Sequence, residues 1–286
     1  MKIILGDNQF FGINHHDLNK GNDTKELFSD KNAIIEFIKE TLKLGLDGFM
    51  INSNQKGYHV VKNYNKVFNE EIHYSIPYPH KYATLVNEEG MLNLLKYILK
   101  NTSISNLVIS FPKFILTRNV KYLIPLVTSL EIPSNLPKGS TVYLQNIITD
   151  MLIGLNRFDI LEAFAKDLRT KGYNPGLITL NPKLLDSLIT KSKILNEEDL
   201  TVCFNINYDG FNVFPNKSEV ESFVKHNHNY KLMGMSIFSS GGSNISKSIE
   251  YINSLKLDYI VFGSSKLKNI ESNFKSFKEN KLNYDN

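Results

Sequence analysis

The sequence has no tryptophan, a single cysteine and no long run of apolar residues. A single cysteine excludes an internal disulfide and a cysteine-rich metal site. Cys203 lies in the apolar stretch TVCFNI, which is typical of a small buried side chain rather than a catalytic thiol. No stretch reaches the roughly 18 apolar residues of a membrane span, and the start, MKIILGDNQ, lacks the pattern of a signal peptide. We expect a soluble, cytoplasmic protein.

An excess of one charge is also absent. There are 33 basic and 29 acidic side chains, which gives a formal net charge of +4. Nucleic-acid-binding proteins normally concentrate basic residues in one patch, so we expect neither a nucleic acid nor a membrane as partner. Internal repeats, low-complexity segments and linkers are missing too. We predict a single domain over residues 1–286, which is long enough to bury a full core.

The sequence does contain a regular alternation of short apolar runs and amphipathic segments. The runs are rich in β-branched residues and continuously apolar, as expected for strands buried on both faces of a parallel sheet. The strand candidates are 2–6, 47–52, 71–76, 106–110, 141–146, 176–181, 200–207, 231–238 and 258–263.

Helical spacing of apolar residues separates several of these runs, most clearly at 34–42, 245–255 and 267–277. Strand–helix alternation over a chain of this length predicts an α/β fold, a TIM (β/α)8 barrel. One strand candidate exceeds the number that the barrel needs. We therefore predict an insertion within residues 70–110 and interpret 71–85 as an elaborated loop.

Polar residues follow nearly every strand candidate. Active sites of (β/α)8 barrels lie at the C-terminal rim of the strands, so this repetition predicts a pocket for a polar small molecule. The residues are Asp7, Asn8, Gln9, Asn52, Ser53, Asn54, Ser110, Lys113, Gln145, Asn146, Asn181, Lys183, Asn205, Asn207, Asp209, Ser236, Ser239, Ser240, Ser264 and Ser265.

The last two strand candidates end in the small-residue stretches SSGG and GSS. Glycine lets the backbone approach a ligand, and the amides at a following helix N-terminus favour an anion. Loops after strands seven and eight are frequent phosphate sites of this fold. We predict a phosphate site here, with plain tight turns as the alternative. Its residues are Ser239, Gly241, Gly242, Gly263, Ser264 and Ser265.

The tail, GMSIFSSGGSNISKSIEYINSLKLDYIVFGSSKLKNIESNF, resembles the C-terminal part of aldo-keto reductase-like proteins. There, a strand ends in Gly-x-Ser and the next helix carries a spaced Ile and Asn, matched here by Gly263, Ser265, Ile270 and Asn273. The opening, IILGDNQFFGIN, is similar to that family's first strand, LGT-x-QFG, and LGLDGFMINSNQKGYHVVKNY to its second-strand segment. The resemblance implies a divergent member that reduces a carbonyl with NAD(P)H.

The resemblance also implies a catalytic tetrad. In the family a Tyr donates a proton, a Lys lowers its pKa, an Asp orients the Lys and a His positions the carbonyl. The alkoxide left by hydride delivery must be protonated, and a Tyr of pKa about 10 needs a cationic neighbour to act near neutral pH. Carried over, the candidates are Tyr58 for the acid, Lys113 for the lysine (Lys81 if 71–76 is a barrel strand), Asn52 or Asp47 for the aspartate and Gln145 for the histidine.

Two departures from the family pattern concern the tetrad. Asn52 in place of an aspartate removes the charge that holds the lysine. Gln145 in place of a histidine still offers an amide that donates to a carbonyl.

The cofactor that the resemblance implies is NADP or NAD, bound by the six loop residues above together with Asn273. Asn269 stands where the family often has the Arg that binds the 2′-phosphate of NADP, and Ser272 where it often has Glu. A sugar phosphate is therefore an alternative occupant of the phosphate site.

We predict an aldo-keto reductase-like oxidoreductase of carbohydrate metabolism that reduces a small, phosphorylated or sugar-derived carbonyl substrate. One alternative is a redox-independent phosphosugar isomerase or aldolase that uses the same loops, with Lys183 as candidate Schiff-base lysine. Another is a non-catalytic ligand-binding barrel. We expect no metal, because the adjacent His15 and His16 would point in opposite directions along an extended segment.

Overall fold

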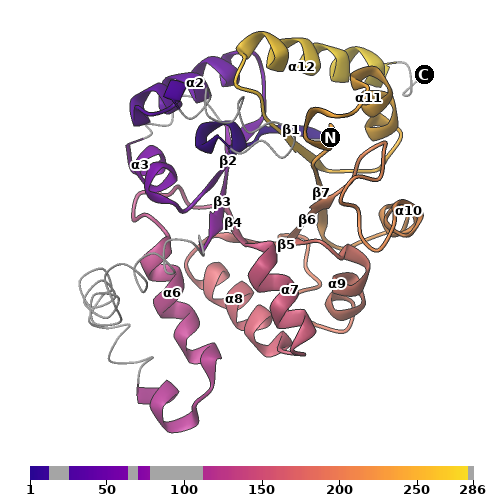
Figure 1. Cartoon of the computed structure of the whole chain (residues 1–286). Coiled ribbons are helices and arrows are strands. Elements are labelled where there is room, and N and C mark those ends of the chain that lie inside the picture. Colours follow the sequence, from indigo (N-terminus) through magenta and orange to yellow (C-terminus); the bar gives the residue numbers. More distant parts are fainter. Residues whose placement is uncertain (13–25, 64–69, 78–111, 283–286) are drawn as a thin grey trace.

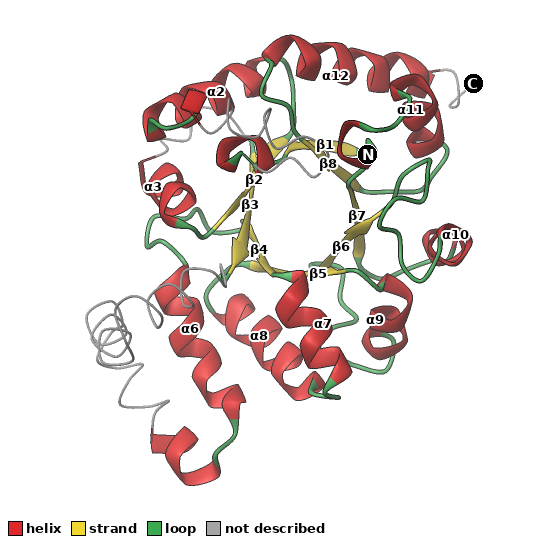
Figure 2. Cartoon of the chain, in the orientation of Figure 1, coloured by secondary structure: helices red, strands yellow, loops and turns green. Residues whose placement is uncertain are grey.

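Eight parallel strands close into a barrel in the computed structural model, which describes residues 1–12, 26–63, 70–77 and 112–282. Each strand pairs with its sequence neighbours, and β1 closes the barrel on β8. Helices surround the strands (Figure 1, Figure 2). The TIM (β/α)8 prediction is confirmed. The strands are β1 Lys2–Leu5, β2 Gly48–Asn52, β3 Glu71–Ile76, β4 Thr141–Leu144, β5 Asn174–Thr179, β6 Thr201–Asn205, β7 Lys231–Met235 and β8 Tyr259–Phe262.

The interpretation of residues 71–85 as a loop is wrong for its first part. Residues 71–76 form β3, which pairs in parallel with both β2 and β4 and is buried from Ile72 to Ile76. Without this strand the barrel could not close between β2 and β4. The candidate strand 106–110 lies outside the described residues, as does most of the insertion predicted within 70–110.

The helices carry the apolar stripes that the sequence predicts. Ile34, Ile38 and Leu42 are buried on α2, whose N-cap Asp30 accepts a hydrogen bond from the amide of Asn32. Among the described residues no helix combines the length and the apolar character needed to cross a membrane. The helices are α2 Lys31–Lys43, α3 Gln55–Asn63, α6 Ile124–Glu131, α7 Asn146–Gly154, α8 Phe158–Thr170, α9 Pro182–Ile189, α10 Lys217–Lys225, α11 Ile245–Asn253 and α12 Leu267–Leu282, with 3-10 turns η1 Asn8–Phe11, η2 Val120–Leu123 and η3 Ser239–Gly241.

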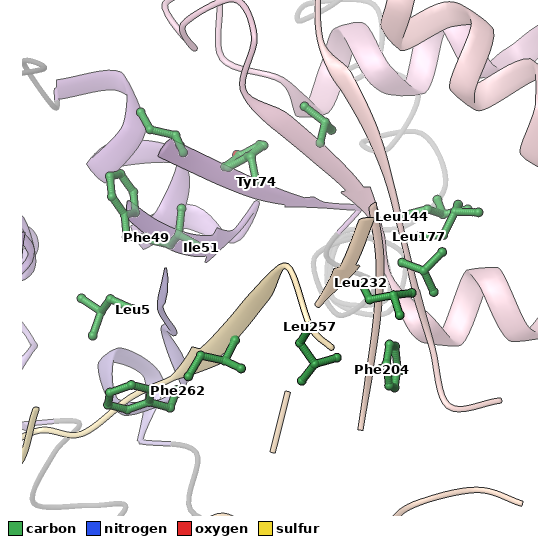
Figure 3. Close-up of a cluster of buried hydrophobic side chains, with 14 of the residues drawn as sticks. Leu5, Phe49, Ile51, Tyr74, Leu144, Leu177, Phe204, Leu232, Leu257 and Phe262 are labelled. Atoms are coloured by element: carbon green, nitrogen blue, oxygen red, sulfur yellow. The ribbon is translucent and has the colours of Figure 1, made fainter. Parts of the chain in front are cut away.

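The strands divide the apolar residues between two cores. Side chains such as Leu5, Phe49 and Phe204 point outward and pack under the helices (Figure 3). A second cluster fills the barrel itself: Ile4, Tyr143, Ile178, Cys203, Met233, Tyr259 and Val261. Burial raises the pKa of the Cys203 thiol, so this residue is a protonated, buried side chain of the barrel interior.

Strand alternation determines which residues reach the mouth of the barrel, by which we mean the C-terminal ends of the strands. Successive strand residues point to opposite faces. Tyr143 belongs to the interior cluster, so Gln145, two residues later, continues that face at the end of β4. Met50 packs on the same cluster, so Asn52 continues the interior face of β2.

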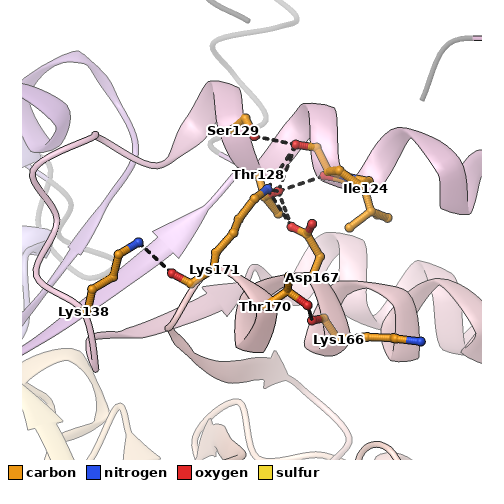
Figure 4. A network of polar contacts seen from close by, with 9 residues as sticks. Ile124, Thr128, Ser129, Lys138, Lys166, Asp167, Thr170 and Lys171 are labelled. Atoms are coloured by element: carbon orange, nitrogen blue, oxygen red, sulfur yellow. Dashed lines mark hydrogen bonds and ion pairs between the residues drawn. The ribbon is translucent and has the colours of Figure 1, made fainter. Parts of the chain in front are cut away.

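A polar network outside the barrel fixes α6 against α8. The ammonium group of Lys171 lies 2.8 Å from Asp167 and donates to the Pro125 carbonyl oxygen at 3.1 Å, while Thr128 donates to Asp167 at 2.5 Å (Figure 4). The last residue of α6, Glu131, is fully buried and accepts a hydrogen bond from Ser53 at 2.5 Å. Because Ser53 follows β2 directly, this contact anchors the end of β2.

Candidate active site

Three side chains from three strand ends form one chain of hydrogen bonds at the mouth. Asp7 follows β1, Asn52 ends β2 and Gln145 follows β4. The side-chain amide of Asn52 donates to Asp7 Oδ2 at 2.8 Å, and Gln145 Nε2 donates to Asn52 Oδ1 at 2.6 Å. The backbone amide of Asn52 donates to the same Asp7 oxygen at 2.8 Å. The barrel thus brings together residues that are far apart in the sequence.

The carboxylate fixes the direction of this chain. An ionised carboxylate only accepts hydrogen bonds, so Asn52 must turn its NH₂ group toward Asp7. Its carbonyl oxygen then faces Gln145, which has to donate. Gln145 retains a second N–H and its own carbonyl oxygen for a ligand. The network therefore presents an oriented amide donor at the mouth.

Asp7 combines burial with an unusual pKa. The residue is 7% exposed, and burial raises the pKa of its carboxyl group from 3.8 to about 6, against the two hydrogen bonds from Asn52 that lower it. A carboxyl group that titrates near neutral pH can both donate and accept a proton, which is the property of a general acid–base catalyst.

No known family model matches the sequence, and no curated protein is similar enough to match it. Among solved structures, the holo form of an aldo-keto reductase from Bacillus halodurans aligns with a TM-score of 0.54 at 8% identity, over 98% of this chain and 90% of that one. The aldose reductase of Giardia lamblia aligns with a TM-score of 0.51 at 9% identity, over 98% and 90% of the two chains. The chain has the aldo-keto reductase fold. The resemblance inferred from the sequence is confirmed at that level.

Against the aldo-keto reductase tetrad, the structure brings two of the four assigned residues together. Asn52 and Gln145, assigned to the Asp and His positions, are the hydrogen-bonded pair at the mouth. Asp47, the alternative for the Asp position, accepts a hydrogen bond from the amide of Ile3 at 2.8 Å, at the opposite end of β2 from Asn52.

Tyr58, the assigned acid, lies on the outer face of α3. Gly57 packs so closely on β2 that a Cβ there would overlap the carbonyl oxygen of Asn52. One residue further along the helix, Tyr58 is turned away from the barrel and is 37% exposed. The helical phase of α3 therefore separates Tyr58 from Asn52 and Gln145.

Lys113, the assigned lysine, is exposed in the helical segment 112–117. Figure 1 shows this segment beyond α6, outside the ring of helices that surrounds the barrel. The alternative, Lys81, was conditional on a barrel strand at 71–76, which is present as β3, but Lys81 lies outside the described residues.

The hydrogen-bond donors of the loop after β7 are already bonded to other groups of the protein. The hydroxyl groups of Ser239 and Ser243 both donate to Asp209 Oδ2 of the preceding loop. The amides of Gly241 and Gly242 donate to carbonyl oxygens of the same loop, at 2.7 and 3.1 Å. In this conformation the loop does not fit a phosphate, because a carboxylate and internal carbonyl groups already accept from its donors.

The loop after β8 differs from the loop after β7 because one of its hydroxyl groups still has a proton to donate. A Cβ at Gly263 would overlap Oε1 of Gln9, so this glycine makes room for a neighbouring side chain. Ser264 Oγ accepts from the Lys266 amide at 3.2 Å and keeps its own proton to donate. Ser265 is partly buried beside it, and Asn273 follows in the second turn of α12.

Two basic residues complete this second loop. Lys266 and Lys268 are exposed at the start of α12, where the first amides have no partner within the helix. The loop thus offers a hydroxyl donor and a helix N-terminus to an anion, with two lysines close by in the sequence. Asn269 turns its amide toward Ser264 Oγ, at 3.4 Å.

Another candidate of the sequence lies on an outer helix. Lys183, in the first turn of α9, has a half-exposed side chain paired with Glu219 of α10, so it is not part of the barrel interior. Over the described residues, no three His, Cys, Asp or Glu side chains come together as metal ligands.

Sequence reasoning noted Asp7 only as one polar residue among many at strand ends. The signal that could have singled it out is in the opening pattern, because Asp7 stands where the family pattern LGT-x-QFG has Thr. Its burial and its contact with Asn52 depend on the neighbouring strand and needed the structure.

Proposed function

We propose that this chain is an oxidoreductase of the aldo-keto reductase type that reduces the carbonyl group of a small, sugar-derived substrate, with Asp7 as the residue that exchanges the proton. The observation that carries the proposal is the hydrogen-bonded chain Asp7–Asn52–Gln145, which includes the two residues that we assign to the Asp and His positions of the family's tetrad. The fold supports the reaction type by analogy, and the site chemistry supports the residue roles.

In this proposal Gln145 positions the substrate. Its remaining N–H donates to the carbonyl oxygen, and Asn52 holds the amide in that orientation. A bound nicotinamide would supply the hydride. Carboxamide and carboxyl side chains pair well with the hydroxyl groups of a sugar-derived substrate, since they offer donors and acceptors side by side.

Asp7 supplies the proton that the alkoxide needs. At neutral pH about a tenth of a carboxyl group with pKa about 6 is protonated, a fraction large enough for general acid catalysis. The role that the family gives to a Tyr with a cationic neighbour would thus pass to a buried carboxyl group, without a lysine.

NAD or NADP is the proposed cofactor. The loop after β8, with Ser264 and the nearby Lys266 and Lys268, would hold one of its phosphates, and Asn273 follows Ser265 in the second turn of α12. The loop after β7, with Ser239, Gly241 and Gly242, would first have to release Asp209.

A second candidate function is isomerisation of a phosphorylated hydroxycarbonyl compound without a redox cofactor. The loop after β7 favours this function, because its donors are already hydrogen-bonded within the protein. Only the loop after β8 is then available, and it would bind a single phosphate group and not a dinucleotide. Asp7, ionised at neutral pH, would then act as the base that removes a proton next to the carbonyl group.

One experiment separates these functions. The protein is titrated with NADH and NADPH by fluorescence, then assayed for reduction of D-glyceraldehyde. In parallel it is incubated with dihydroxyacetone phosphate in deuterated water, and exchange of the carbon-bound proton is followed by NMR.

Nicotinamide binding with reduction supports the first function. Deuterium exchange without nicotinamide binding supports the second, and neither reaction with retained phosphate binding indicates a non-catalytic barrel. The Asp7→Asn variant is the matched control, since both reactions require Asp7.

A further inference from the structure

Ser75 carries a buried hydroxyl group that has no hydrogen-bond partner among the described residues. The residue lies in β3 and is 1% exposed, and no described group accepts from or donates to its Oγ atom. Buried polar groups in folded proteins are nearly always hydrogen-bonded. The exception at Ser75 therefore calls for a physical reason.

The position of Ser75 places it at the mouth of the barrel. His73, two residues earlier, faces the interior, where its Nδ1 lies 2.9 Å from the hydroxyl group of Tyr143. Strand alternation puts Ser75 on the same face. In the sheet register Ser75 pairs with Asn52 of β2, so both residues stand at the same level of the barrel.

The neighbours of Ser75 are already committed to one another. Asn52 uses its carbonyl oxygen for Gln145 and an N–H for Asp7. The hydroxyl group of Ser75 thus lies beside an oriented polar network but outside it, and no described residue supplies its partner.

We propose that Ser75 donates a hydrogen bond to an oxygen atom of the ligand in the mouth, as a second donor beside Gln145. Two neutral donors on one oxygen stabilise the negative charge that develops when a carbonyl group is reduced or enolised. The identity of that atom as a carbonyl oxygen rests on the proposed function. The location of the contact at Ser75 does not depend on it.

Two buried serines serve as matched controls. Ser53 is 1% exposed like Ser75, but its hydroxyl group donates to Glu131 at 2.5 Å. Ser248, fully buried on α11, has an unpartnered Oγ like Ser75 and takes no part in the hydrogen-bonded chain at the mouth. The three alanine variants separate the effect of an unpaired hydroxyl group from the effect of a ligand contact.

The first measurement is the melting temperature of the full chain. Ser75→Ala and Ser248→Ala remove an unpaired buried hydroxyl group and should raise Tm by about 2 °C or more. Ser53→Ala removes a hydrogen-bond donor from the buried Glu131 carboxylate and should lower Tm. A fall for Ser75→Ala like that for Ser53→Ala would show that Ser75 is already paired, which overturns the proposal.

The second measurement locates the ligand oxygen. Crystals of the wild type and of Ser75→Ala are soaked in acetone, a minimal carbonyl probe that requires no turnover. The wild type should show the acetone oxygen within hydrogen-bonding distance of Ser75 Oγ, and the variant should lose it. An ordered water that stays on Ser75 in place of acetone, or acetone bound equally in the variant, overturns the proposal.

Turnover provides the link to the proposed function. If the protein reduces D-glyceraldehyde, Ser75→Ala should lower kcat by about 10²-fold, as loss of one oxyanion donor does, while Ser248→Ala leaves kcat unchanged. Equal kcat values in Ser75→Ala and wild type overturn the donor role. Absence of nicotinamide binding would refute the proposed reduction, yet the acetone contact would still test Ser75.

Discussion

Asn52 makes two hydrogen bonds to a single oxygen of Asp7, one from its backbone amide and one from its side chain, each 2.8 Å long. Because both occupy Oδ2, the proton of the neutral acid belongs on Oδ1. Proton exchange with a substrate would therefore take place at Oδ1 without breaking the contact to Asn52. The same contact sets the orientation of Gln145.

The pKa of Asp7 predicts how stability depends on pH. Its pKa in the folded chain is about 6, above the ordinary 3.8, so the folded protein binds this proton more tightly than the unfolded chain does. The contribution of Asp7 to the free energy of unfolding should be largest below about pH 4, decline by about 3 kcal/mol as the pH rises to about 6, and stay level above it. Asp7→Asn should remove this decline and raise stability at slightly alkaline pH. Urea denaturation over this pH range measures the effect.

A control for this prediction is Asp209, whose pKa is lowered by hydrogen bonds from Ser243 and Ser239. Asp209→Asn should act in the opposite direction, because it removes a carboxylate that the folded state prefers ionised. An unchanged pH profile in Asp7→Asn would show that Asp7 titrates normally in the folded protein.

The rate of reaction should depend on pH in a direction that identifies the role of Asp7. If Asp7 donates a proton during reduction, the rate should fall as the pH rises through about 6, because the acid form disappears. If Asp7 removes a proton during isomerisation, the rate should rise through the same pH. Initial rates of both assays over this range decide between them, and a flat profile in both would exclude Asp7 from the chemistry.

Tyr58 and Lys113 should be dispensable. Both are exposed, Tyr58 on the outer face of α3 and Lys113 in the helical segment 112–117. We expect Tyr58→Phe and Lys113→Ala to retain full turnover, whereas removal of a general acid costs about 10²-fold or more. Gln145→Ala is the positive control, since it deletes the oriented donor. A large loss in Tyr58→Phe would restore the family's tetrad for this chain.

The sequence predicted the barrel because apolar strands and amphipathic helices alternate along it, and this pattern depends on local residues alone. It failed at β3, because nine strand candidates compete for eight places and the count does not show which one lies outside the barrel. In β3, Glu71, His73 and Ser75 alternate with the outward-facing apolar residues. Their partners, such as Tyr143 of β4 for His73, come from other strands. Two of the four residues assigned to the tetrad, Tyr58 and Lys113, do not lie beside the other two, for a related reason. The position of Tyr58 along α3 turns its side chain outward, and burial raises the pKa of Asp7 toward neutral pH. Neither effect can be predicted from the order of residues alone.

Asp209 should control anion binding at the loop after β7. Its carboxylate accepts from Ser239 and Ser243, and Lys217 and Lys247 lie near enough to lower its pKa further. Asp209→Ala should free both hydroxyl groups and remove a negative charge near the two ammonium groups, so that affinity for inorganic phosphate rises by about tenfold or more, as expected for charge-assisted hydrogen bonds. Isothermal titration calorimetry measures the gain. Ser264→Ala in the same background distinguishes the two loops, and an unchanged affinity in Asp209→Ala would show that the engaged backbone amides prevent binding there.

Gly263 should be required by Gln9 rather than by a ligand. A Cβ at position 263 would overlap Oε1 of Gln9, whose Nε2 donates to the Gly6 carbonyl oxygen at 2.6 Å. Gly263→Ala should displace the Gln9 side chain and destabilise the fold by about 1 kcal/mol for the lost hydrogen bond. In Gln9→Ala the obstacle is gone, so adding Gly263→Ala to it should cost little more. A double-mutant cycle by urea denaturation measures the coupling between the two positions.

If Gly263→Ala lowers the free energy of unfolding as much in the Gln9→Ala background as in the wild type, the backbone at 263 requires glycine independently of Gln9. A loss of phosphate affinity without a loss of stability would give Gly263 the ligand-contacting role that the sequence predicts.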